Sequence, residues 1–416
     1  MKQILHTPEG VRDIYGMEFA KKQILQERLQ KVMHLYGYHD IQTPTMEYFD
    51  VFSKEIGTTP SKELYKFFDR EGNTLVLRPD ITPSIARATA TIYDVEKQPA
   101  RLCYTGNTFI NHNSYRGKLH ENTQMGVELI GMGDVEADAE MITLAVECLK
   151  EAGLADFQIH IGNVDFFQCL VEDAELSEAD EERLLELIEN RNYFGVEELL
   201  EAANAKKTTK RIFQILPELV GGCEVLEVAK RIAPTRQAQE AAGRLKDMYA
   251  LLVAYGVEKY VTFDLSMMGT YGYYTGIIFR GYTYGTGDAI VKGGRYDWLL
   301  EKFGKKADSI GFVIVVDELL SAMGRQNITI ACDRKNTLVL YDESRQSEAI
   351  SLAMDFRKKE KCTELLKSNS EYDEAYYMAY AKQMQCESML YLKENNEIEI
   401  IHLLSGKRKI VKSKIR

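Results

Sequence analysis

The apolar positions in the first part of the chain follow a helical spacing. From Gly16 onward they recur every three or four residues until Gly37, at Ala20, Ile24, Leu25, Leu29, Val32, Met33 and Tyr36. Because one face of a helix repeats at this interval and glycine is a common stop signal, the pattern predicts one long amphipathic helix. Residues 38–44 then have an extended pattern that ends at Pro44, which suits the edge or the end of a strand.

Short runs rich in β-branched and aromatic residues follow this helix. They predict strands at residues 74–78, 102–109, 124–130, 157–162, 261–265, 276–279 and 309–315. Helical patterns lie between some of them, notably at 83–93 and 135–152. Since short loops separate these strands as often as helices do, we expect an α+β fold, an antiparallel sheet with flanking helices, and no doubly wound parallel sheet.

Two further changes of pattern divide the chain. Residues 172–255 read as helical, with leucines and isoleucines spaced among many charges, and predict a helical insertion within a core that spans 1–325. Residues 331–416 alternate between strand and helix patterns, with strands expected at 337–341, 362–366, 388–392 and 398–404 and helices at 347–358 and 372–385. This last part therefore reads as a small separate α/β domain.

Composition and charge narrow the functional classes. The chain has 416 residues, of which 45% are hydrophobic and 28% charged, as in ordinary globular proteins. Its formal net charge of −11 disfavours partners held mainly through phosphate, such as bulk nucleic acid or an anionic membrane. The seven cysteines are odd in number and never spaced as C-x-x-C, which indicates reduced thiols and no disulfide framework or zinc site. With no run of about 20 apolar residues and no apolar signal core at the start, we expect a cytoplasmic protein without a membrane segment.

The first candidate for chemistry is the turn after the strand at 74–78. Asp80 and Thr82 lie two residues apart, so a carboxylate and a hydroxyl can face the same side, and such a pair suits an ammonium group. The alternative is that both only cap the next helix, with Thr82 as the N-cap and Pro83 in the first helical position.

The second and third candidates lie on later strands. In the strand at 124–130, alternation places Gln124, Gly126 and Glu128 on one face, where the glycine leaves room for a ligand. The alternative is a polar face turned to solvent. In the block at 268–279, glycines alternate with tyrosines that include Tyr273 and Tyr274, a lining that suits a small, flat, polar ligand. An ordinary glycine-rich hairpin would have the same composition.

Taken in order, these segments resemble the class II core of histidyl-tRNA synthetase. The resemblance covers residues 1–325 and rests on six blocks: Thr7-Pro8-Glu9-Gly10-Val11-Arg12-Asp13, Tyr36-Gly37-Tyr38, Leu77-Arg78-Pro79-Asp80, Gly126-Val127-Glu128, Tyr273-Tyr274-Thr275-Gly276 and Gly293-Gly294-Arg295-Tyr296-Asp297. It implies that Asp80, Thr82 and Gln124 lie near the amino group of histidine. It also implies that Glu128 and Tyr274, with the neighbouring Tyr273, lie near the imidazole. Asp80 stands where the family usually has glutamate, which keeps the charge but shortens the reach.

The nucleotide half of the synthetase pattern departs from the family. Arginines that the resemblance expects in three motifs fall on Ile110, Gly269 and Glu318, and an acidic position falls on His112. Because a preorganised cation at the reacting phosphate is worth roughly a hundred- to a thousandfold in rate, losing three should abolish adenylation. The remaining loop cations Arg116 and Lys118 do not replace such a clamp and read more simply as solvated charges.

This split pattern resembles the regulatory subunit of ATP phosphoribosyltransferase, a synthetase-like family that accompanies the short catalytic subunit of the first step of histidine biosynthesis. The resemblance implies a non-catalytic subunit without cofactor or metal, a short catalytic chain as partner, and histidine as an allosteric effector. It also implies a dimer through the first helix and its neighbouring strand, with no tRNA expected. The alternatives are an active histidine-tRNA ligase and a synthetase-like paralogue that acts on another small amine.

Four residues stay without a firm assignment. His112, His120 and His160 have no metal-ligand spacing and read as polar surface or strand residues. Arg295 either contacts a ligand or braces the glycine turn that precedes it.

Overall fold

The computed structural model describes residues 5–53, 59–112, 118–269, 273–332 and 336–412. Within these ranges the chain forms two compact units, one containing Lys22–Ile330 and the other Ala331–Arg416. The larger unit carries every residue that the sequence singles out for chemistry.

A nine-stranded sheet forms the frame of the larger unit, in the order β1-β5-β6-β12-β11-β10-β7-β9-β8. The five central strands pair antiparallel with one another, whereas β1 pairs parallel with β5 and β7 pairs parallel with β9. The expected antiparallel sheet is thus confirmed for the centre, and its two sides are mixed. The strands are β1 His39–Asp40, β5 Ala100–Phe109, β6 Glu121–Ile130, β7 Phe157–Asn163, β8 Val220–Gly221, β9 Val261–Asp264, β10 Thr275–Thr283, β11 Val291–Arg295 and β12 Ser309–Val315.

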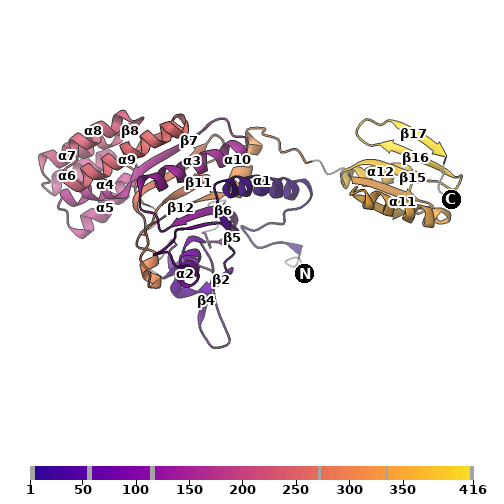
Figure 1. Ribbon diagram of the computed structural model, residues 1–416, viewed down its shortest axis with the longest axis horizontal. Helices are drawn as coiled ribbons and strands as arrows, with labels where there is room; N and C mark the ends of the chain where they lie inside the picture. The colour runs from indigo at the N-terminus through magenta and orange to yellow at the C-terminus, as the bar shows by residue number, and fades with distance from the viewer. Residues whose placement is uncertain (1–4, 54–58, 113–117, 270–272, 333–335, 413–416) are drawn as a thin grey trace. The chain divides into compact units, whose positions relative to one another are not determined.

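Helices flank this sheet, as the pattern predicts. Helix α1 (Gly16–Leu35) buries the apolar stripe read from the sequence, including Leu25, Leu29 and Met33. Helices α3 (Val135–Glu151) and α10 (Val316–Arg325) pack against β12 and β6. Figure 1 shows α3 and α10 along one side of the sheet and α2 (Thr82–Ile92) on the other.

A three-stranded sheet precedes α2. Its order is β2-β4-β3, with β2 Met46–Tyr48, β3 Lys66–Phe68 and β4 Thr74–Leu77. The turn from β4 into α2 carries Asp80 and Thr82. Behind this turn, Ile81 and Ile85 pack in one core cluster with Tyr104, Tyr273 and Tyr296, so the turn rests on a buried apolar support.

The chain between β7 and β9 is helical and adds only the short strand β8. Its helices are α4 Val164–Asp173, α5 Glu178–Glu189, α6 Tyr193–Ala202, α7 Lys207–Ile215, α8 Glu224–Ile232 and α9 Arg236–Tyr255. Helix α9 packs against α3, α4 and α8. The helices therefore join the core through α9 and its neighbours (Figure 1).

The smaller unit is a five-stranded sheet in the order β14-β13-β15-β16-β17, with two helices. Its elements are β13 Asn336–Tyr341, α11 Gln346–Lys358, β14 Thr363–Lys367, α12 Glu374–Gln383, β15 Cys386–Leu392, β16 Glu397–His402 and β17 Arg408–Lys412. The sequence pattern missed β17, which is mostly exposed and carries three basic residues among its five. Across the ranges that the structure describes, no helix of either unit combines the length and the apolar character that crossing a membrane requires.

Candidate functional site

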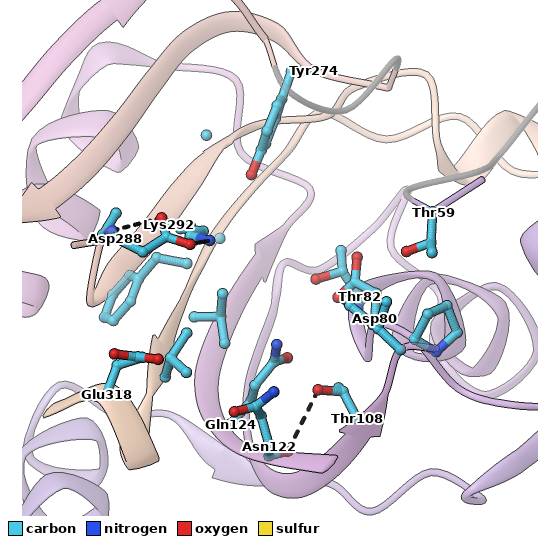
Figure 2. Close-up of a pocket in the computed structure, with 18 of the residues that line it drawn as sticks. Thr59, Asp80, Thr82, Thr108, Asn122, Gln124, Tyr274, Asp288, Lys292 and Glu318 are labelled. Atoms are coloured by element: carbon cyan, nitrogen blue, oxygen red, sulfur yellow. Dashed lines mark hydrogen bonds and ion pairs between the residues drawn. The ribbon is translucent and has the colours of Figure 1, made fainter. Parts of the chain in front are cut away.

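A cavity of about 170 Å³ opens on one face of the central sheet. Its walls come from the turn between β4 and α2, from β6, β11 and β12, and from the tyrosines before β10. All six residues that the sequence singled out line it, namely Asp80, Thr82, Gln124, Glu128, Tyr273 and Tyr274. Figure 2 shows Asp80 and Thr82 on one side, Asp288 and Lys292 on the other, and the Tyr274 hydroxyl directed toward the space between them.

Glu128 lies at the base of the cavity and is only 1% exposed. Its Oε1 accepts a hydrogen bond of 2.7 Å from Thr82 Oγ1, and its Oε2 accepts one of 2.5 Å from Tyr296 Oη. Burial raises the pKa of the Glu128 carboxyl to about 8, although these hydroxyl donors lower it in part. The backbone of Gly311 passes so close that a Cβ there would lie 1.8 Å from Glu128 Oε2. A carboxyl with a pKa near neutrality is thus held in a fixed position.

Asp80 is fixed by backbone donors at the start of α2. Its Oδ1 accepts from the N–H groups of Ile81 and Thr82, and its Oδ2 accepts a 3.2 Å bond from Tyr273 Oη. Burial raises the pKa of this carboxyl, and the three donors oppose that shift. The prediction of Thr82 as N-cap is wrong: α2 begins at Thr82, and Asp80 is the residue whose side chain bonds the first N–H groups. The Thr82 hydroxyl is therefore committed to Glu128 instead.

The alternation expected on β6 is observed, but the expectation that Gly126 leaves room for a ligand is wrong, because a Cβ there would lie 2.5 Å from Tyr104 Oη. Met125, Val127 and Leu129 are fully buried in the core, whereas Gln124 and Glu128 face the cavity. Gln124 Oε1 is buried and accepts no hydrogen bond from any residue within the described ranges. Because an unsatisfied buried carbonyl is costly, this oxygen marks a place where a ligand donor would be stabilised.

The part of the cavity opposite Asp80 and Thr82 has no net charge, since Asp288 and Glu318 are balanced by Lys118 and Lys292. Ile110 and His112 also line the cavity. Its two lysines share one partner, since Lys118 Nζ and Lys292 Nζ lie 3.5 Å and 3.3 Å from Asp288 Oδ2. Among the charged side chains that line the cavity in the described part of the chain, four are carboxylates and two are lysines: Asp80, Glu128, Asp288 and Glu318 against Lys118 and Lys292.

Gly269, where the synthetase pattern expects an arginine, is not among the residues that line this cavity. Gly269 lines a different hollow, between the helical region and β7 and β10. Arg116 falls outside the described residues.

Arg295 braces the structure and does not line the cavity. It is 3% exposed, and its Nε donates to Asp138 Oδ1 at 2.7 Å. Its Nη atoms donate to the carbonyls of Met132 and Asp134, and Arg244 from α9 holds the second oxygen of Asp138. This resolves the alternative in favour of a structural role.

Tyr296 is a cavity residue that sequence reasoning did not single out. It follows Arg295 directly in the last of the six blocks, and alternation along that segment turns it toward Glu128. Its place beside a buried Arg295 was the signal that could have found it.

None of the three unassigned histidines is exposed, since His120 is buried and His112 and His160 are partly buried. The expectation that His120 is a surface or strand residue is wrong, because it is 9% exposed and its Nδ1 lies 2.8 Å from Tyr65 Oη. It lies in the loop before β6, beside Tyr65. His160 lies on β7 as a half-buried strand residue, edge-on to Tyr282.

Comparison with known proteins places these features in context. Residues 10–319 match the histidyl-tRNA synthetase family. An ATP phosphoribosyltransferase regulatory subunit from Acetivibrio thermocellus is 38% identical over 402 residues, which are 97% of this chain and 96% of that protein. One from Clostridium acetobutylicum is 39% identical over 76% of this chain and 79% of its own length.

Two solved structures are also similar. The first, described as an ATP phosphoribosyltransferase regulatory subunit/histidyl-tRNA synthetase from Bacillus halodurans, has a TM-score of 0.82 and 32% identity, covering 93% of this chain and 98% of that one. A histidyl-tRNA synthetase from Nostoc has a TM-score of 0.80 over 98% of this chain and 97% of its own, at 18% identity. The second likeness shows the fold alone.

Proposed function

The chain belongs to the family of ATP phosphoribosyltransferase regulatory subunits, which has the class II fold of histidyl-tRNA synthetase, and on this premise we propose that it senses free histidine. In this proposal histidine occupies the cavity beneath α2 and the subunit has no catalytic activity of its own. A short catalytic chain is the partner whose activity it supports and inhibits.

The observation that carries the proposal is the arrangement of acceptors in the cavity. The α-ammonium group of an amino acid needs a carboxylate and further oxygen acceptors, which Asp80 and the buried Gln124 Oε1 supply. An imidazole needs a partner for each ring nitrogen, and the Glu128 carboxyl and the Tyr274 hydroxyl are of the right kind. The histidine-binding set is therefore Asp80, Thr82, Gln124, Glu128, Tyr273 and Tyr274.

The end of the cavity near Asp288 argues against ATP as a ligand, because it has no net positive charge. A triphosphate needs several cations, but both lysines there already share Asp288, and Glu318 adds a second negative charge. The synthetase resemblance expects arginines at Ile110, Gly269 and Glu318, and none of these residues has a cationic side chain to bind phosphate. We therefore infer that the chain neither adenylates histidine nor charges tRNA, and needs no cofactor.

Feedback follows from linkage. Histidine shifts the complex only if it binds the inhibited state more tightly than the active state, and the difference in affinity sets the extent of inhibition. The rigid turn of Asp80 and Thr82 connects the ligand directly to α2, which gives the bound histidine a helix to act on.

Assembly as a dimer is the other part of the proposal. Strand β1 is the outermost strand of the nine-stranded sheet, so one side of its backbone is open to another chain, and α1 precedes it directly. A dimer through α1 and β1 would present two histidine cavities to the catalytic chains.

The test is calorimetric titration of the full chain with L-histidine in the absence of ATP. We expect saturable binding, at least tenfold weaker in Glu128→Ala and in Asp80→Asn. Glu47→Gln is a matched control, since Glu47 is also buried but its partner is Arg87 and it does not line the cavity. Unchanged affinity in both cavity variants would refute the assignment of the pocket, and histidine-dependent exchange of pyrophosphate into ATP would refute the non-catalytic role.

The partner is tested separately. The chain should co-purify with a short ATP phosphoribosyltransferase catalytic subunit, and histidine should inhibit the mixed complex but not a complex that contains the Glu128→Ala variant. Failure to associate would remove the partner and leave the histidine site standing.

A further inference from the structure

Three side chains with metal-binding atoms meet at the outer edge of the nine-stranded sheet. They are His34 near the end of α1, Asp40 on β1 and Cys103 on β5. Their ligand atoms all lie within 4.8 Å of one another. The cluster is separate from the histidine cavity, since none of its members lines that cavity.

We propose that His34, Asp40 and Cys103 form a binding site for a zinc ion with one open coordination position. The register of the sheet creates this site, because Asp40 and Cys103 are direct partners in the parallel pairing of β1 with β5. Their side chains therefore project from the same face, and the last turn of α1 brings His34 over them. Sequence spacing could not show this, since Cys103 is far from the other two along the chain.

The distances require only a small adjustment to bind metal. His34 Nε2 lies 3.0 Å from Asp40 Oδ2, and Cys103 Sγ lies 3.4 Å from Asp40 Oδ1. Bonds of about 2.0–2.3 Å in a tetrahedron imply separations of roughly 3.3–3.7 Å between ligand atoms. These two distances involve different oxygens of Asp40, so for any one ligand oxygen only one pair is already close to that range, and the other pairs, which lie within 4.8 Å, need to close by roughly 1–1.5 Å at most.

The donor set favours zinc over harder ions. An imidazole nitrogen, a thiolate and a carboxylate suit Zn²⁺, whereas Mg²⁺ and Ca²⁺ prefer oxygen donors alone. Gln30 Nε2 donates a 2.7 Å hydrogen bond to Asp40 Oδ1 and orients the carboxylate, as outer partners do in metal sites. On binding, the Cys103 thiol gives its proton to solvent and the sulfur becomes a thiolate ligand.

The geometry also provides an entry path. The side chains of His34 and Asp40 are 45% and 56% exposed, whereas Cys103 is buried beneath them. In a single subunit a metal ion can therefore arrive from solvent, contact the sulfur last and keep water as its fourth ligand, and the dimer proposed through α1 and β1 would then close over the site. Once bound, it would tie the end of α1 to the edge strand and to β5.

Cobalt provides a spectroscopic test on the reduced, full-length protein. We expect one equivalent of Co²⁺ to give the near-ultraviolet charge-transfer band of a cobalt–thiolate bond, and Zn²⁺ to displace it. Cys103→Ala should remove the band. His34→Ala, at a half-exposed position that does not support the core, should weaken binding at least tenfold and leave folding intact.

A second buried thiol provides the control. Cys169 in α4 is as buried as Cys103 but belongs to no such cluster among the described residues, so Cys169→Ala should keep the band and the affinity. Absence of saturable cobalt or zinc binding would overturn the proposal. So would a thiolate band that survives Cys103→Ala, or one that Cys169→Ala removes equally.

Discussion

Glu128→Gln should move stability and histidine binding in opposite directions above neutral pH. The carboxyl is 1% exposed, and burial raises its pKa from an ordinary 4.5 to about 8. The native chain thus holds a proton on Glu128 between these pH values, where the unfolded chain has already released it. Because the unfolded state then binds fewer protons, the contribution of Glu128 to stability is complete below about pH 4.5 and is lost as the pH rises through 8.

The size of this effect follows from the gap between the two pKa values. A gap of about 3.5 between the two pKa values corresponds to about 5 kcal/mol. The amide of the variant does not ionise, so this loss disappears. The substitution also alters the hydrogen bonds that Thr82 and Tyr296 donate to Glu128. This change opposes the gain in stability by about 1 kcal/mol for each bond between neutral groups.

Trp298 makes the measurement specific for the larger unit. It is the single tryptophan of the chain, it is 57% exposed, and it lies just after Tyr296. Urea unfolding followed by its fluorescence, near pH 4.5 and above pH 8, gives the free energy of unfolding of both proteins. We expect the native chain to lose several kcal/mol more than Glu128→Gln over this interval, and the variant to be the more stable protein at the alkaline end.

Binding supplies the second half of the test. Calorimetry above pH 8 should show histidine affinity at least tenfold lower in Glu128→Gln than in the native chain. The amide cannot carry the negative charge that the Glu128 carboxylate offers to the imidazole. Equal pH dependence of stability in the two proteins would refute the account of burial. Equal affinity would refute the role of Glu128 in binding.

Four further substitutions test the cavity and the residues that support it. Gly311→Ala places a Cβ 1.8 Å from Glu128 Oε2 and should abolish histidine binding in calorimetry. Gly243→Ala, in α9, adds a Cβ with no neighbouring atom within 4 Å and should raise the free energy of unfolding by roughly 0.5–1 kcal/mol. Arg295→Met leaves the buried Asp138 with Arg244 alone and should lower the urea-unfolding free energy by about 3–5 kcal/mol; an effect below about 1 kcal/mol would contradict the bracing role. Tyr296→Phe removes the hydroxyl that donates a 2.5 Å hydrogen bond to Glu128, and it should weaken histidine binding about tenfold while the protein stays folded. Unchanged affinity would contradict this prediction.

Much of the fold could be predicted from the sequence because its central strands are buried on both faces. Strand β12 is a nearly continuous apolar run, and the predicted strand at 309–315 has the bounds that the structure shows. Strand β17 was missed because an exposed edge strand with three basic residues has no apolar alternation to detect. The prediction of an antiparallel sheet is confirmed for the centre, whereas the parallel pairing at β1 and β9 depends on tertiary contacts that a local pattern does not contain.

The candidate site shows the same division. Resemblance named six residues from separate segments, and the structure brings them to one cavity. Their partners were beyond sequence reasoning, because they depend on register and rotamer. Thr82 was expected near the amino group of histidine, with a helix cap as the alternative, but its hydroxyl donates to Glu128. Lys118 shares Asp288 with Lys292 although it lies 170 residues from that carboxylate.

The two groups of cavity residues differ in how far the surrounding fold depends on them. Glu128 and Asp80 are tied to Thr82, Tyr296 and the first N–H groups of α2, so changing either would leave buried donors without a partner and weaken the core as well as the site. Ile110 and Glu318 are partly exposed at the rim. A cation is dispensable at such a position because solvent can replace its interactions. Under the proposed function, the side chains that would recognise histidine are thus also needed for folding, whereas the positions at which the synthetase resemblance expects arginine are not.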